Sequence, residues 1–179
     1  MLNLKKLFDE TYSYTVDYDL YVPFDLKINY TKNDMTRGNY YCINIGSSKS
    51  ILEIYIESST GRVNSITLVS VDPNKRRLGT IKNLEAITVI DKVPGLSLDW
   101  KMEKENDSYV NYVNCDNDFE VVLSKTNIVI VFQSTGEDRV ITKMRDILFV
   151  FDQELKLSKI FLEFPDKNTF EFLKKTLYL

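Results

Sequence analysis

The sequence predicts a mainly β protein of the α+β class, with antiparallel sheets in two lobes and a short helix at each end of the chain. Apolar residues alternate with polar ones over many short segments, which is the pattern of half-buried strands. Aromatic residues make up 12% of the 179 residues, with 11 Tyr and 10 Phe, and such residues favour sheets. Gly (6) and Pro (4) are scarce, so no long flexible linker is expected.

The first half begins with a predicted helix in LNLKKLFDE, where Leu2, Leu4 and Leu7 form a short amphipathic pattern. Alternation then predicts strands in YSYTVDYDLYV, DLKINY and YYCINI, which turn residues separate. Residues 51–70, ILEIYIESSTGRVNSITLVS, predict a β-hairpin whose turn includes Gly61, a residue able to adopt positive φ. DPNKRRLG follows as a connector, and LEAITVI as a short strand.

The second half opens with VPGLSLDW and continues through an alternating YVNYVNC segment. Hairpin material follows in EVVLSKTNIVIVFQSTGEDRVITKM, and ILFVFDQELKLSKIFLEF predicts another hairpin over residues 147–164. NTFEFLKKTLYL predicts a C-terminal helix with Asn168 as its N-cap and Glu171 three residues later. Phe170, Leu173 and Leu177 follow helical spacing in this segment.

The hairpins at 51–70 and 147–164 resemble each other, which suggests an internal duplication. Chance similarity between short β patterns is the alternative. The matched residues are Glu57 with Asp152, Ile66 with Ile160, and Val22-Pro23 with Val93-Pro94. The unequal spacing of these matches predicts an insertion in the second copy, within residues 101–145.

These observations divide the chain into an N-terminal β lobe, residues 1–83, and a C-terminal β lobe, residues 84–179, which carries the insertion and the terminal helix. Neither lobe offers a long apolar face of its own, so the two are expected to pack against each other. A single compact domain is the other organisation that the length allows.

The composition limits the chemistry that the chain can perform. Histidine is absent, which excludes Ser-His and Cys-His nucleophile pairs, histidine bases and most zinc sites. The run from Asn114 to Glu120 resembles the start of a calcium loop, but Phe119 stands where glycine is needed and Lys125 where glutamate should ligate. We therefore predict no catalytic residue, no cofactor and no metal.

The net charge of −3 argues against nucleic acid as a direct partner. The start of the chain has no signal-peptide core, and no apolar stretch approaches the roughly 20 residues of a membrane span. A cytoplasmic protein without a membrane partner is therefore expected. In that compartment Cys42 and Cys115 are expected to be thiols at half-buried strand positions, not a disulfide.

Residues 99–120 form a strongly acidic segment. Seven acidic residues and two lysines give it a net charge of −5, whereas the whole chain carries −3. A solvated loop is the simpler interpretation. The functional interpretation is an anionic patch that attracts a basic partner. The predicted partner-binding residues are Asp99, Glu103, Glu105, Asp107, Asp116, Asp118 and Glu120.

The apolar strand, acidic turn and returning strand of residues 51–70 and 146–164 resemble immunity proteins of bacterial polymorphic toxin systems, including contact-dependent growth inhibition. The Tyr-rich strands, the low His and Cys content, the acidic pI and the size are also similar to that group. This resemblance implies a cytoplasmic inhibitor, not an enzyme. It would bind the C-terminal domain of its cognate toxin, with a nuclease as the expected activity, and occlude the active site or an exosite.

Two other functions stay open. One is a non-catalytic, β-rich structural or assembly module. The other is a carboxylate-based hydrolase, which needs two acidic side chains about 5–9 Å apart across a cleft. The sequence does not indicate the oligomeric state.

Overall fold

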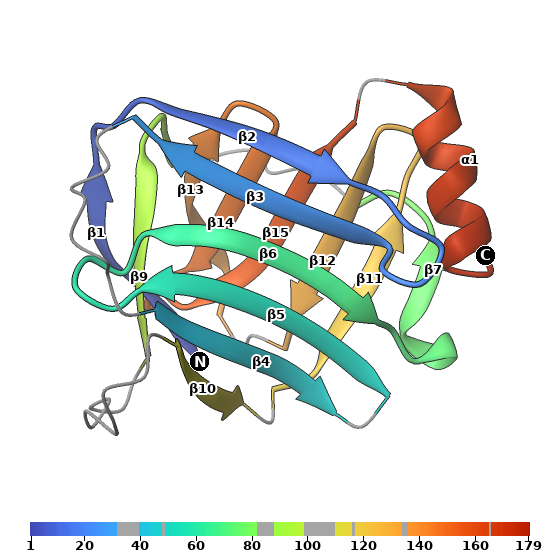
Figure 1. Ribbon diagram of the computed structural model, residues 1–179, viewed down its shortest axis with the longest axis horizontal. Coiled ribbons are helices and arrows are strands. Elements are labelled where there is room, and N and C mark those ends of the chain that lie inside the picture. The colour runs from blue at the N-terminus through green and yellow to red at the C-terminus, as the bar shows by residue number, and fades with distance from the viewer. Residues whose placement is uncertain are drawn as a thin grey trace.

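The computed structural model describes residues 1–31, 40–47, 49–81, 88–98, 110–115, 117–133, 136–164 and 166–179. Within these ranges the protein is mainly β, with fifteen strands in three sheets and one α-helix near the C-terminal end. Two large sheets face each other, the third sheet lies at one end of the molecule, and the helix lies at the other end (Figure 1). The predicted mainly β class is confirmed.

The sheet nearer the viewer in Figure 1, called the front sheet below, has six strands. Neighbouring strands are antiparallel, except that β10 and β4 run parallel. The order across the sheet is β10 (Val110–Cys115), β4 (Tyr40–Ser47), β5 (Ser50–Glu57), β6 (Val63–Ser70), β3 (Phe24–Tyr30) and β2 (Tyr12–Asp17).

The opposite sheet, called the rear sheet, has seven strands. Its two edge strands run parallel to their neighbours, and its other pairs are antiparallel. A short 3-10 helix, Pro73–Lys75, precedes the first edge strand. The order is β7 (Arg76–Leu78), β11 (Phe119–Leu123), β12 (Asn127–Phe132), β15 (Leu157–Glu163), β14 (Ile147–Asp152), β13 (Asp138–Met144) and β8 (Thr88–Ile90).

Five strands of each sheet share one order. In the front sheet a hairpin, β2–β3, is followed by a meander, β4–β5–β6, whose last strand lies beside β3. In the rear sheet the hairpin β11–β12 is followed by the meander β13–β14–β15, whose last strand lies beside β12. The hairpins expected at 51–70 and 147–164, now β5–β6 and β14–β15, are confirmed and occupy the same place in the two sheets.

The residue matches drawn from the sequence differ in outcome. Glu57 and Asp152 are the last residues of β5 and β14, and Ile66 and Ile160 lie at the middle of the two return strands. The match of Val22-Pro23 with Val93-Pro94 is wrong. Val22-Pro23 precedes β3, whereas Val93-Pro94 begins β9 (Val93–Leu98), which belongs to neither large sheet. A dipeptide recurs too easily to identify an equivalent strand, and the insertion inferred from it has no support.

The third sheet is a two-stranded ribbon, called the end ribbon, in which β1 (Leu2–Phe8) pairs antiparallel with β9. The predicted N-terminal helix is therefore wrong. Leu2 and Leu4 also fit the strand period of two, and seven residues are too few to separate that period from the helical one. Pairing with a distant strand decides between the two conformations.

Each strand of the end ribbon is hydrogen-bonded to the turn of one hairpin. In the front hairpin the Leu96 N–H donates to the Gly61 carbonyl oxygen (2.8 Å), and in the rear hairpin the Leu4 N–H donates to the Leu155 carbonyl oxygen (2.9 Å). Gly61 has φ +79°, which confirms the predicted positive φ, and a Cβ there would lie 2.2 Å from the Leu96 carbonyl oxygen. This close approach requires glycine.

The predicted C-terminal helix is confirmed as α1 (Lys167–Thr176), but its N-cap is Asp166 and not Asn168. The Asp166 Oδ1 accepts the N–H of Thr169 (2.9 Å), which is the usual capping bond. Leu173 and Leu177 are buried, as the helical spacing predicts. No helix in the described ranges is long and apolar enough to cross a membrane.

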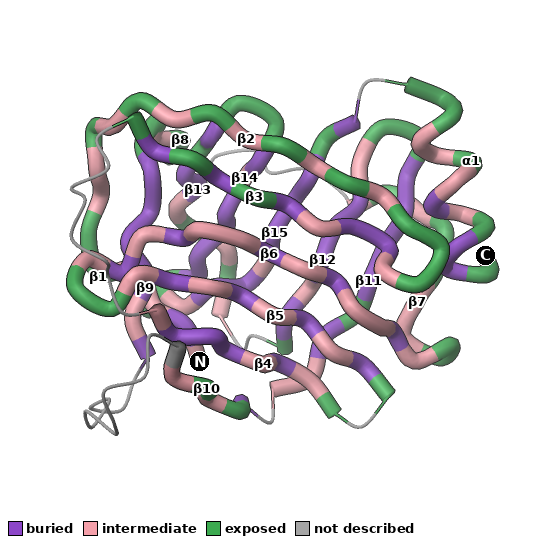
Figure 2. Tube along the Cα trace, viewed as in Figure 1, coloured by how far each residue is buried: buried purple, intermediate pink, exposed green. Residues whose placement is uncertain are grey.

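One hydrophobic core fills the space between the front and rear sheets. Along many strands, buried residues of the inner face therefore alternate with more exposed residues of the outer face (Figure 2). Its largest fully buried side chains include Phe24, Leu26, Ile43, Leu52, Ile54, Ile66, Phe119, Phe149 and Phe151. A second, smaller cluster lies on the outer face of the rear sheet and contains Val122, Val129, Ile141, Val150 and Phe161.

The two halves of the chain contribute strands to each other's sheets. β7, from residues 1–83, joins the rear sheet, and β10, from residues 84–179, joins the front sheet. The expected lobe boundary between residues 83 and 84 lies outside the described residues. Cys42 and Cys115 form no disulfide, as predicted. Cys42 lies inside β4 and Cys115 is the last residue of β10, and both are buried, whereas half-buried positions were expected.

Candidate functional site

Two of the seven predicted partner-binding residues are described. Asp118 forms an ion pair with Lys75, and its Oδ1 accepts the N–H of Phe119 (3.0 Å). Glu120 is exposed on β11. The other five, Asp99, Glu103, Glu105, Asp107 and Asp116, lie outside the described residues.

Strand β10 lies near the middle of the acidic segment in the sequence. It is an edge strand of the front sheet. Tyr112 and Asn114 lie beside Cys42 and Asn44 of β4, on the outer face of that sheet. Glu120 alternates with the inward residues of β11 and therefore lies on the outer face of the rear sheet. The described part of the acidic segment thus reaches both outer faces and does not form one patch.

A row of polar side chains crosses the outer face of the front sheet from edge to edge. We call it the polar row. The Asn44 Nδ2 donates to the Asn114 Oδ1 (3.0 Å), and the Thr67 Oγ1 donates to the Asp25 Oδ1 (2.7 Å). Successive residues lie opposite each other in the strand register and are Asn114, Asn44, Glu53, Thr67, Asp25 and Asp17.

Three members of the polar row are carboxylates, and their partners differ. Asp25 forms an ion pair with Lys27 (2.8 Å). Burial opposes ionisation of Asp25, but the hydrogen bonds from Lys27 and Thr67 outweigh it and lower the pKa of Asp25. Glu53 forms no ion pair with any residue in the described ranges. The row therefore carries net negative charge, with Glu53 able to meet an incoming cation.

A second row on the same face contains Tyr112, Cys42 and Tyr55, which lie opposite one another on β10, β4 and β5. Tyr112 is 69% exposed, so its ring is available for contact. Cys42 is fully buried, and burial raises the pKa of its thiol. A hydrogen bond with Cys42 also raises the pKa of Tyr55. This row therefore offers aromatic surface, not a reactive thiolate.

A cavity of about 410 Å³ opens where β10 and the β4–β5 hairpin end. Its lining combines polar residues, among them Asn44, Glu53 and Asn114, with the apolar Ile45 and Ile51. Its size falls at the lower end of the range for small-molecule sites. Glu53 is the one carboxylate among the described lining residues, whereas a carboxylate-based hydrolase needs two.

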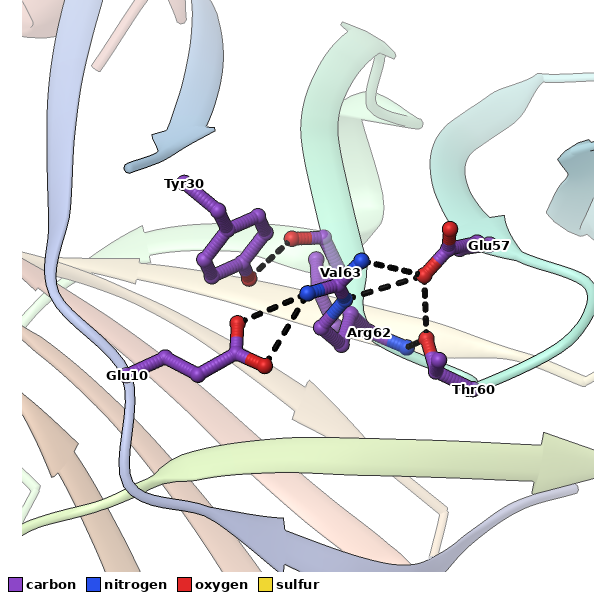
Figure 3. Close-up of polar contacts among 6 residues, drawn as sticks. All are labelled: Glu10, Tyr30, Glu57, Thr60, Arg62 and Val63. Carbon is purple, nitrogen blue, oxygen red and sulfur yellow. Dashed lines mark hydrogen bonds and ion pairs between the residues drawn. The ribbon is translucent and has the colours of Figure 1, made fainter. Parts of the chain in front are cut away.

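A half-buried charge cluster lies at the front hairpin turn (Figure 3). Arg62 donates through Nη1 to Glu10 (2.8 Å) and through Nε to Glu57 (2.9 Å), and its side chain is only 11% exposed. Its guanidinium lies 5.1 Å from the centre of the Tyr30 ring, and the Tyr30 hydroxyl donates to the Val63 carbonyl oxygen (2.6 Å). Every charge in the cluster has a partner, so it fastens the segment before β2 to this turn and is a structural feature.

No protein-family model matches this sequence, and no curated protein matches it. Within the described ranges, no three acidic or cysteine side chains lie close enough together to hold a metal ion.

Sequence reasoning did not identify the polar row. Its members occupy the polar positions of alternating segments such as ILEIYIE and YYCINI, and that alternation was the available signal. The row itself becomes visible only when the strand order and register are known, because its six residues come from six separate strands.

Proposed function

We propose that this protein is an immunity protein that binds the toxin domain of its own bacterial system in the cytoplasm. The binding surface is the outer face of the front sheet at its β10–β4–β5 side, with Tyr112, Asn114, Asn44 and Glu53. Tyrosine and asparagine are typical of protein-binding surfaces because they combine contact area with adaptable hydrogen bonds. An unpaired carboxylate on such a surface suits a basic partner, such as a nuclease domain.

The observation that carries this proposal is the position of β10. This strand comes from the middle of the acidic segment, and it lies at the edge of the front sheet beside β4. The acidic segment in which β10 lies carries a net charge of −5 in the sequence. This charge, together with the Glu53 carboxylate beside an exposed aromatic and amide surface, supports a docking site for a basic protein.

The mechanism that follows is occlusion. A β-sheet holds the backbone of its strands in place, so little backbone entropy is lost on binding, which favours affinity without catalysis by this chain. The inhibitor covers the basic cleft of the toxin or an adjacent exosite. No bond is made or broken by the inhibitor, so the function makes no demand for a nucleophile or a general base.

The test is co-expression with the toxin domain encoded by the neighbouring gene, together with association kinetics for the purified pair. Wild-type protein should restore growth and form a complex. Glu53→Lys should slow association, most visibly at low salt, because it reverses a charge in the proposed interface. Tyr112→Ala should speed dissociation by removing an exposed aromatic contact.

Glu120→Lys is the matched control, because it makes the same charge change on the outer face of the rear sheet. It should leave association unchanged. If Glu120→Lys impairs binding while Glu53→Lys does not, the interface lies on the rear side. If wild-type protein neither binds the toxin domain nor restores growth, the immunity function is wrong, and the structural-module alternative takes its place.

We also infer that the front and rear sheets arose by duplication of one five-strand unit. The order of five strands that the two sheets share and the equivalent positions of Ile66 and Ile160 support this origin. Duplication would explain how one sheet could keep a polar outer face for a partner while the other buried its outer face in a second apolar cluster.

A further inference from the structure

We propose that β2 pairs with β2 of a second copy of this chain, which joins two front sheets into one continuous sheet across a twofold axis. This inference goes beyond the proposed function and does not depend on it. Strand β2 is the last strand of the front sheet, and no other strand in the described ranges pairs with its outer edge. A free edge of this kind is a template for another strand.

The edges of the rear sheet are protected, and β2 is not. β7 and β8 have three residues each, β7 contains Arg76 and Arg77, and Asp91 and Lys92 follow β8 directly. Short length and charge are common means of blocking unwanted strand pairing. β2 has six residues and one charge, Asp17 at its end, and the stretch TYSYTV at residues 11–16 contains no charge, no glycine and no proline. Its β-branched and aromatic residues favour pairing.

The internal repeat offers a second argument. β11 takes the place in the rear sheet that β2 takes in the front sheet, since both are the first strand of the five-strand unit. The outer edge of β11 is covered by β7, through pairs at Val121, Val122 and Leu123. In the rear sheet, this edge of the five-strand unit pairs with a further strand. The corresponding edge in the front sheet, at β2, therefore has a geometry that also permits one.

The pairing register follows from the hydrogen bonds of β2. The Thr31 N–H donates to the Thr11 carbonyl oxygen (3.0 Å), so alternate residues from Thr11 onward face β3. The backbone groups of Tyr12, Tyr14 and Val16 therefore point away from the sheet. Antiparallel pairing with a second copy places Tyr14 opposite Tyr14 of the partner copy, with Tyr12 opposite Val16. Each such pair exchanges two hydrogen bonds, which gives about six between the copies.

The inner side of β2 is already anchored, which leaves its edge in a fixed position. The Tyr14 hydroxyl donates to Asp146 in the β13–β14 turn, and Arg145 lies 5.9 Å from the centre of the Tyr12 ring. On the outer face, Ser13 and Thr15 are exposed. In the proposed register Ser13 lies opposite Thr15 of the partner copy, and Asp17 lies opposite the uncharged Thr11. The twofold closes the contact, and the expected assembly is a dimer.

The experiment is a measurement of molar mass by light scattering over a range of concentrations. Wild-type protein should approach twice the chain mass of 20.9 kDa. The double variant Ser13→Lys/Thr15→Lys places lysine opposite lysine across the dimer axis and should run at the single-chain mass. Asn29→Lys is the matched control, because Asn29 is exposed on the same face of the adjacent strand β3, opposite Ser13, and away from the edge. It should stay dimeric.

A covalent test fixes the register and does not depend on disruptive charges. In Ser13→Cys/Thr15→Cys, oxidation should link two chains, because these residues face each other in a non-hydrogen-bonded pair about 4.5 Å apart at Cα. Asn29→Cys should remain uncrosslinked. A single-chain mass for wild-type protein at all concentrations, or species that grow beyond the dimer, would overturn the proposal. So would equal crosslinking of Asn29→Cys.

Discussion

The front and rear sheets share a strand order but differ on their outer faces. The register relates the two rows position by position. In the front sheet the row is Asn44, Glu53, Thr67, Asp25 and Asp17, and in the rear sheet it is Lys143, Leu148, Phe161, Val129 and Val122. The inner faces are apolar in both sheets because they share one core. The core therefore fixes the fold, and the outer face is where two copies of one arrangement can acquire different roles.

The largest expected difference concerns the two hairpin turns. Arg62 of the front turn forms an isolated β-bridge with Gly95 of the end ribbon, and Lys156 of the rear turn forms one with Asn3. Arg62→Ala leaves Glu10 and Glu57 half-buried without their cation and should cost about 3 kcal/mol of unfolding free energy. Lys156→Ala disturbs an exposed pair with Glu154 and should cost less than about 1 kcal/mol. Urea denaturation measures both.

Arg62→Lys separates charge from geometry at the front turn. It keeps the positive charge but cannot donate to two carboxylates with a planar fork, so an intermediate loss is expected. Equal losses for Arg62→Ala and Lys156→Ala would show that the backbone contacts of the turns, and not the Arg62 cluster, hold the ribbon.

A smaller difference is expected at equivalent positions of β6 and β15. Phe161 is 6% exposed on the rear outer face, and Phe161→Ala should cost about 3 kcal/mol through lost burial and a cavity. Thr67→Ala removes one hydrogen bond to Asp25 and should cost about 1 kcal/mol. Thermal and urea unfolding should give the same order. A cost for Thr67→Ala as large as that for Phe161→Ala would mean that the polar row is buried and is no binding surface.

The smallest effect is a pH dependence confined to the front sheet. Because the folded pKa of Asp25 is lowered, its contribution is present above the unfolded pKa of about 3.9 and is lost as pH falls through the folded pKa. Thr67→Val removes one of the bonds that lower this pKa. The Asp25 carboxyl should then titrate at higher pH in an NMR experiment, and less stability should be lost on acidification. The equivalent rear position is Val129, so Val129→Ala should leave the acid dependence unchanged.

Alternation of residues was sufficient to predict most strands and both matched hairpins, because it reports which side of a strand is buried. It could not predict β1, whose leucines fit a helix or a strand equally well until β9 pairs with it. It also could not predict that β10, from the second half of the chain, pairs with a strand of the first half in the front sheet. Strand exchange of this kind depends on contacts far apart in sequence, which a local pattern does not contain.

For the candidate site, composition found the acidic segment but not the surface that it borders. Glu120 was grouped with the other acidic residues by position in the sequence, yet alternation along β11 turns it to the rear outer face. Asp118 was counted as available, whereas Lys75 neutralises it. In the sequence Glu53 is only a polar residue between apolar neighbours. The strand register places it opposite Asn44 and Thr67.

The end ribbon has a consequence for how the chain folds. β1 precedes the other described strands in the sequence, but its partners are β9 and the turn at Leu155, which belongs to the β14–β15 hairpin. β1 can therefore make its native contacts only when these distant segments are also available. Contacts this far apart in sequence close large loops and slow the rate-limiting step, so folding is expected in milliseconds to seconds. We expect neither half to acquire its native structure alone, and unfolding to be a single cooperative event.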